Sequence, residues 1–130
     1  MMPDVEFEYD FVAGKASIRS TRNGRQYRDA KCLARAERIA QACNQTIPDG
    51  PLEVIIEAHR KARKGEEHGA AIISKPDVDN IAKLALDALI SDDERVVKLG
   101  VVRVVGPVEK TIVKIWKYEN PCVSRAKVEA

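Results

Sequence analysis

The order of hydrophobic periods along the chain constrains its fold most, because strands and helices bury side chains at different spacings. Apolar and polar residues alternate in residues 4–12 and again in residues 52–58. The later runs Val96–Val105 and Thr111–Tyr118 are rich in β-branched residues, and a Gly106-Pro107 turn separates them. The sequence therefore predicts at least four strands.

Two other segments repeat apolar residues every three or four positions, which predicts amphipathic helices over residues 27–44 and 79–90. Residues 13–26 mix glycine, serine and basic residues, which predicts a cationic loop, and residues 70–74 allow a short extra strand. No repeat or linker divides the chain. We therefore expect a single α/β (α+β) domain, with a mixed sheet of four to five strands and two main helices.

The length of 130 residues suits one domain with one core. We expect this domain to span residues 1–118 and residues 119–130 to form a flexible C-terminal tail. No apolar run could span a bilayer, and the N-terminus lacks a secretory pattern, so the sequence predicts a soluble, intracellular protein without a membrane partner. Three cysteines without a C-x-x-C pair predict reduced thiols: Cys32, Cys43 and Cys122.

Charge is distributed unevenly, although the formal net charge is only +2. Residues 15–38 hold eight basic and two acidic residues, whereas residues 77–94 hold six acids and one lysine. Basic flanks around an acidic centre suit a nuclease, because cations hold the phosphate backbone and carboxylates hold a divalent cation. The alternative is that the basic residues are ordinary solvated surface. The candidate DNA contacts are Lys15, Arg19, Arg22, Arg25, Arg60, Lys61, Arg63 and Lys64.

The acidic centre surrounds the second predicted helix. At about 100° per residue, Asp79, Asn80, Lys83 and Asp87 fall on one side of that helix, opposite its apolar residues. Asp77 lies two positions before Asp79, so both carboxylates point the same way if the helix is entered by extended chain. Their oxygens are the ligands that Mg²⁺ prefers.

A third carboxylate follows the helix at Asp92-Asp93. We expect Asp93 to be the third metal ligand as the chain returns, and Asp92 to point away from it. Helix stabilisation is the competing explanation, because an aspartate before a helix is a good cap and Asp79–Lys83 is an ordinary i,i+4 pair. A bare D-x-D also occurs in sugar-nucleotide transferases, so spacing alone leaves the metal site and the helix-stabilising role open.

The run from Lys75 to Leu89, K-P-D-V-D-N-I-A-K-L-A-L-D-A-L, is followed by Asp92-Asp93 and then Val96-Val97. This pattern resembles the signature of the RusA family of Holliday junction resolvases, with seven polar positions in register. The resemblance covers residues 51–118 well, and residues 15–27 are similar in kind to the basic loop of the phage-type members. The chain lacks the proline-rich opening common in the family, and its loop between Leu89 and Asp92 is shorter.

The resemblance implies an Mg²⁺-dependent endonuclease, with Mn²⁺ as a substitute, that acts without a small organic cofactor. It implies a cytoplasmic homodimer, bacterial or phage-encoded, that binds four-way DNA junctions by their structure and makes paired symmetric nicks. Asp77, Asp79 and Asp93 match the catalytic, metal-binding aspartates of the family, and Lys83 matches its catalytic lysine.

Three further residues are expected to support this site. Asn80 suits a cap or a hydrogen-bonding role, Asp87 suits a salt bridge to Lys83, and Asp92 would assist its neighbour. Two other classes of function stay open: a junction- or duplex-binding protein that does not cleave, and a metal-dependent enzyme that acts on a small phosphorylated substrate.

Overall fold

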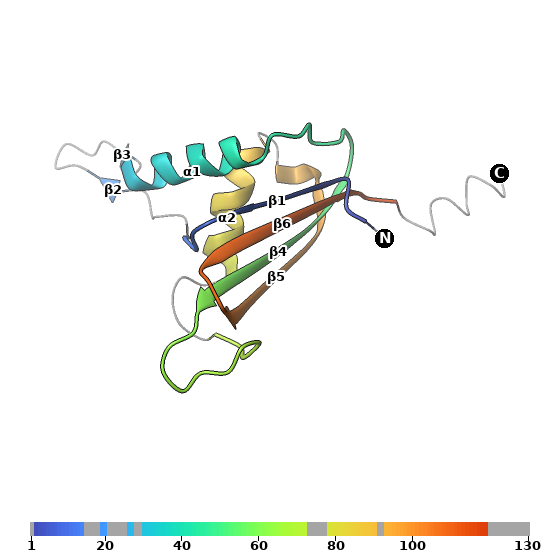
Figure 1. Cartoon of the computed structure of the whole chain (residues 1–130). Helices are drawn as coiled ribbons and strands as arrows, with labels where there is room; N and C mark the ends of the chain where they lie inside the picture. The colour runs from blue at the N-terminus through green and yellow to red at the C-terminus, as the bar shows by residue number, and fades with distance from the viewer. Residues whose placement is uncertain are drawn as a thin grey trace.

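The main sheet has four strands in the order β1-β6-β4-β5 (Figure 1). The structure is a computed structural model. It describes residues 2–14, 19–20, 26–27, 30–72, 78–90 and 93–119. In chain order the elements are β1 (Val5–Tyr9), β2 (Arg19–Ser20), β3 (Gln26–Tyr27), α1 (Ala30–Ala42), β4 (Leu52–Lys61), α2 (Val78–Leu89), the 3-10 helix η1 (Asp93–Arg95), β5 (Val96–Gly106) and β6 (Lys110–Lys117).

Strand pairing in the sheet is mixed. β6 runs antiparallel to both β1 and β4, so Val113 lies opposite Phe7 on one side and Ile56 on the other. β4 and β5 are parallel, with Ile56 opposite Val101. Parallel neighbours need a crossover connection, and here α2 lies within it.

The core lies between one face of the sheet and the two helices. The burial of β1 and β4 alternates along each strand, as their period-two sequences predict. α1 contributes Ile39, and α2 contributes Ile81 and Leu84, all at most 1% exposed. The one buried polar side chain among the described residues, Thr111, donates its hydroxyl to the Phe11 carbonyl oxygen at 2.7 Å. The helices therefore cover only one face of the sheet.

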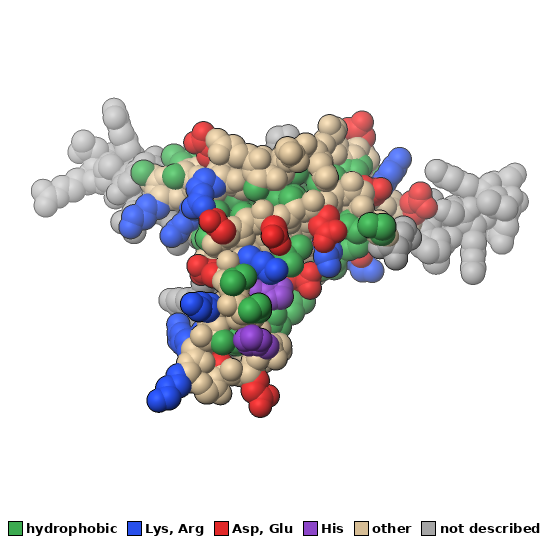
Figure 2. Space-filling model, viewed as in Figure 1, with side chains coloured by type: hydrophobic (Ala, Val, Ile, Leu, Met, Phe, Trp, Pro, Cys, Tyr) green, Lys and Arg blue, Asp and Glu red, His purple; other side chains and the backbone are tan. Residues whose placement is uncertain are grey.

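The other face of the sheet mixes charged side chains with apolar ones such as Ile55 and Val102. Figure 2 shows acidic and basic side chains interleaved across it. Cross-strand ion pairs connect them: Lys114–Glu57 at 3.0 Å, Lys98–Glu53 at 3.6 Å and Lys110–Glu8 at 3.9 Å. Such pairs stabilise neighbouring strands modestly, so this face is held together without a helix upon it.

The expected α+β domain is confirmed, with four strands in the main sheet and two α-helices. The prediction for residues 13–26 was incomplete, because β2 and β3 pair there as a separate two-stranded sheet. Of the possible strand at residues 70–74, the structure describes residues 70–72, which form an isolated bridge between Ala71 and Val104. Cys43 is a free thiol, whereas Cys122 and the tail beyond Glu119 lie outside the described residues.

The two faces of β4 give a test of this arrangement. Ile56 is fully buried against the helices, whereas its neighbour Ile55 points to the open face and is half-buried. Ile56→Ala should lower the free energy of unfolding by about 2–5 kcal/mol, because it leaves a cavity in the core. Ile55→Ala should cost clearly less in urea denaturation, and equal losses would contradict the assignment of the faces.

Candidate functional site

The polar side of α2 carries an aspartate–lysine pair. Lys83 Nζ lies 3.1 Å from Asp79 Oδ2, one helical turn apart, and their side chains are 56% and 71% exposed. The opposite side of the helix buries Ile81, Leu84 and Ala85 in the core. The helix therefore presents its carboxylate and ammonium to solvent, as its sequence pattern predicts.

The pair is weak as a stabilising element. An exposed i,i+4 ion pair contributes only about 0.2–0.5 kcal/mol to a helix. The position of the pair matters for chemistry more than for stability. A phosphate bound to a cation at Asp79 would lie within reach of the Lys83 ammonium. Asn80 is half-buried and Asp87 is exposed on the same helix.

The structure describes the other predicted aspartates only in part. Asp77 and Asp92 lie outside the described residues, and of Asp93 the structure describes the backbone, which begins η1. Arg95 ties η1 to the chain before β4 by donating to the carbonyl oxygens of Gly50, at 3.1 Å, and Pro48. Figure 1 shows that η1 adjoins the last turn of α2. Asp79 lies in the first turn of α2, and the Asp93 backbone follows the last turn of that helix.

The basic segment after β4 is folded around an acidic residue that the sequence analysis missed. The guanidinium of Arg60 donates two hydrogen bonds to the Glu66 carboxylate, at 3.0 and 2.7 Å. Glu66 also accepts a hydrogen bond of 2.7 Å from the Arg63 backbone N–H. Arg60 is thus engaged within the protein, while Lys61, Arg63 and Lys64 remain exposed.

These hydrogen bonds lower the pKa of Glu66 from 4.5 to about 2, and the bond from Arg60 is the largest cause. The same bond raises the pKa of Arg60. Because the folded-state pKa of Glu66 lies below its ordinary value, its stabilising effect is complete above about pH 4.5 and is lost as the pH falls toward 2. The contact is therefore fully formed at neutral pH.

Backbone hydrogen bonds tie the same segment to β5. We call residues 62–72 the buttressed loop. Gly65 and Gly69 adopt φ values of 85° and 88° there, which glycine permits without a Cβ clash. The loop is bound to the β5 end by Ala62 N–H to Gly106 O at 3.0 Å, Gly69 N–H to Val105 O at 2.8 Å, Val105 N–H to Ala70 O at 2.9 Å, and Ile72 N–H to Arg103 O at 3.2 Å.

The N-terminal basic segment is described only in part. Lys15, Arg22 and Arg25 lie outside the described residues, and Arg19 is described as backbone in β2. Further along, Arg38 pairs with Asp10 at 2.5 Å and lies over the Phe11 ring. Figure 2 shows Lys and Arg side chains beside α1 and around the loop that follows β4.

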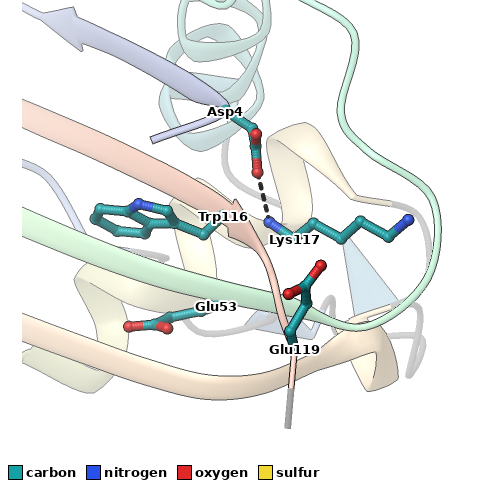
Figure 3. Close-up of a pocket in the computed structure, with 5 residues that line it drawn as sticks. All are labelled: Asp4, Glu53, Trp116, Lys117 and Glu119. Carbon is teal, nitrogen blue, oxygen red and sulfur yellow. Dashed lines mark hydrogen bonds between the residues drawn. The ribbon is translucent and has the colours of Figure 1, made fainter. Parts of the chain in front are cut away.

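A pocket of about 500 Å³ lies where β1 and β4 begin and β6 ends (Figure 3). It is lined by Asp4, Glu53, Trp116, Lys117 and Glu119. Asp4 is already engaged there, because its Oδ2 accepts a 2.8 Å hydrogen bond from the Lys117 backbone N–H. The pocket contains none of the residues of the predicted site.

The described features define a small α+β domain that presents an aspartate–lysine pair on α2 and exposed basic residues on the buttressed loop, groups suited to phosphate chemistry. The family model described as endodeoxyribonuclease RusA matches residues 11–116. The chain therefore belongs to the RusA family, as the resemblance predicted. Membership implies endonuclease activity of the Holliday junction resolvase type. No curated protein matches the chain significantly.

The match includes α2, η1 and the buttressed loop, so it covers every described part of the candidate site. Among the helices that the structure describes, none is long and apolar enough to cross a membrane.

The role of Glu66 can be tested by limited proteolysis. Glu66→Gln should loosen the buttressed loop and speed tryptic cleavage after Lys61, Arg63 and Lys64, because the neutral amide binds Arg60 more weakly. The matched control is Glu67→Gln, which makes the same charge change one residue away. Equal cleavage rates in both variants would contradict the buttressing role, as would wild-type protein whose loop is cut rapidly at neutral pH.

Proposed function

We propose that this protein is an Mg²⁺-dependent, structure-selective endonuclease that resolves four-way (Holliday) DNA junctions by paired symmetric nicks. It acts as a homodimer in the cytoplasm. The observation that carries the proposal is the exposed Asp79–Lys83 pair on α2, within a chain that belongs to the RusA family. The helix packs its apolar side firmly into the core, so the pair has a rigid base.

Asp77, Asp79 and Asp93 are the proposed ligands of the cation, and Mn²⁺ would substitute for Mg²⁺. The donor set fits, because carboxylate oxygens are hard ligands and the Asp79 side chain is accessible at 71% exposure. Within the described residues no three metal-ligating side chains meet. The bound ion would supply Lewis-acid polarisation of the scissile phosphate.

Lys83 would hold the phosphate. Its ammonium is 3.1 Å from the Asp79 carboxylate, so it would lie close to the reacting group and stabilise the negative charge that develops there. Asn80, Asp87 and Asp92 would support the site through hydrogen bonds and charge.

The basic segments would hold the DNA backbone. In the buttressed loop and at its start, Lys61, Arg63 and Lys64 are exposed and free of the Arg60–Glu66 contact at their side chains. Arg60 would act by fixing the loop. Lys15, Arg19, Arg22 and Arg25 would add contacts from the N-terminal segment. Binding through these cations should weaken steeply with salt, because phosphate neutralisation releases counterions.

Cleavage of a synthetic four-way junction tests the proposal. Asp79→Asn should reduce Mg²⁺-dependent nicking by about 100-fold or more, since even residues that only support metal ligands change metal affinity about 10–100-fold. Binding to the junction in EDTA should be unchanged, because the fold loses at most one weak surface pair.

The control is Asp49→Asn, which removes an exposed carboxylate in the turn before β4 and should cleave like the wild type. The proposal fails if wild-type protein with Mg²⁺ or Mn²⁺ leaves the junction uncut, and the role of Asp79 fails if both variants cleave equally.

A further inference from the structure

We propose that the pocket where β6 ends is a docking site for an arginine side chain of a partner protein. The guanidinium would stack on Trp116 and pair with the carboxylates of Glu53 and Glu119. The inference does not depend on the proposed function, because none of the residues proposed for metal or DNA binding lines this pocket.

The pocket combines negative charge with an aromatic ring. Its described lining has three carboxylates against one ammonium, which gives a formal charge of −2. Glu53 and Trp116 are paired residues of the neighbouring strands β4 and β6, and their side chains point the same way in Figure 3. The side chain of Lys117 extends away from the indole. The pocket therefore repels an anion such as a DNA phosphate and attracts a cation.

The arrangement of these acids favours a large cation over a metal ion. Within the described part of the chain, no three ligating side chains meet closely enough to hold a metal. The pocket volume of about 500 Å³ lies in the range of about 300–1,000 Å³ that is typical of sites for organic groups. A guanidinium is planar, so it stacks on an indole while it donates hydrogen bonds to carboxylates. It therefore uses both parts of the lining.

The chain binds one of its own arginines in the same way. Arg38 lies over the Phe11 ring, 4.7 Å from the ring centroid, and pairs with the Asp10 carboxylate at 2.5 Å. Trp116 and Glu53 offer the same combination of ring and carboxylate, and the described lining of the pocket contains no arginine. The contact of Glu53 with Lys98 is long, at 3.6 Å, so this carboxylate can also accept hydrogen bonds from an incoming guanidinium.

The position of the pocket leaves the basic surface accessible. Glu53 is the second residue of β4, and the buttressed loop follows the other end of that strand. From Glu53 to Lys61 the strand extends over about 26 Å at about 3.3 Å per residue. A partner that docks at the pocket would therefore leave the exposed cations of the buttressed loop open to a phosphate backbone.

Tryptophan fluorescence tests the docking site directly, because Trp116 is the one tryptophan of the chain. The full-length protein is titrated with the blocked peptide acetyl-Gly-Gly-Arg-Gly-Gly-amide. The matched peptide carries citrulline, which has the shape of arginine without its charge. The arginine peptide should change the fluorescence in a saturable manner, and the citrulline peptide should not.

Substitutions of single carboxylates locate the binding site. Glu53→Gln and Glu119→Gln should each weaken binding of the arginine peptide about fivefold, the largest effect usual for one exposed ion pair. The control is Glu109→Gln, an exposed carboxylate before β6 at the opposite end of that strand, which should bind the peptide like the wild type. Glu53→Gln should cleave a four-way junction like the wild type, so loss of docking is distinguishable from failure of the proposed endonuclease.

Several results would overturn the proposal. These are no response to the arginine peptide, equal responses to both peptides, or an equal loss of binding in Glu109→Gln. If the peptide binds only after Arg125→Gln and Lys127→Gln, the C-terminal segment of the same chain is the occupant. If dilution of the protein changes the Trp116 fluorescence and the peptide does not, a second copy of the chain is the occupant. Either occupant contradicts a site for a partner protein.

Discussion

The parallel pairing of β4 with β5 is the constraint on which the rest of the structure depends. Because parallel neighbours need a crossover, the chain must return across the sheet, and α2 lies in that return. The same requirement buries the apolar side of α2 and turns Asp79 and Lys83 to solvent. It also sets the first turn of α2 and η1 at opposite ends of that helix.

Acidic and basic side chains lie on different elements of the fold. Of the acids proposed for metal binding, Asp79 lies in α2 and Asp93 begins η1, whereas the exposed cations Lys61, Arg63 and Lys64 lie on and beside the buttressed loop. Within the basic region, Glu66 acts on the protein itself by fixing Arg60 and the Arg63 backbone. A loop held in this way loses less conformational freedom when it binds a phosphate backbone, so its cations are pre-organised.

The periodic spacing of apolar residues predicted the fold. Individual side-chain contacts and very short strands have no such spacing, so the sequence did not predict them. The alternation of apolar residues correctly predicted the strands β1 and β4. The helical repeat correctly predicted α2 and the side of it that is buried. Strands of two residues, such as β2, carry no detectable period. The Arg60–Glu66 contact depends on how glycines turn the loop, and the separation of Asp79 from Asp93 depends on the direction of the crossover. Spacing along the chain determines neither, so the predicted roles of Asp77, Asp92 and Asp93 remain proposals.

The most direct test of the central claim compares cleavage of a four-way junction with cleavage of linear duplex and flap DNA of the same sequence. The wild-type protein with Mg²⁺ should cut the junction in two symmetric strands and leave the other substrates essentially intact. Equal cleavage of all three would contradict structure selectivity. Tight binding of the junction with no cleavage under any divalent cation would instead identify a junction-binding protein and overturn the endonuclease assignment.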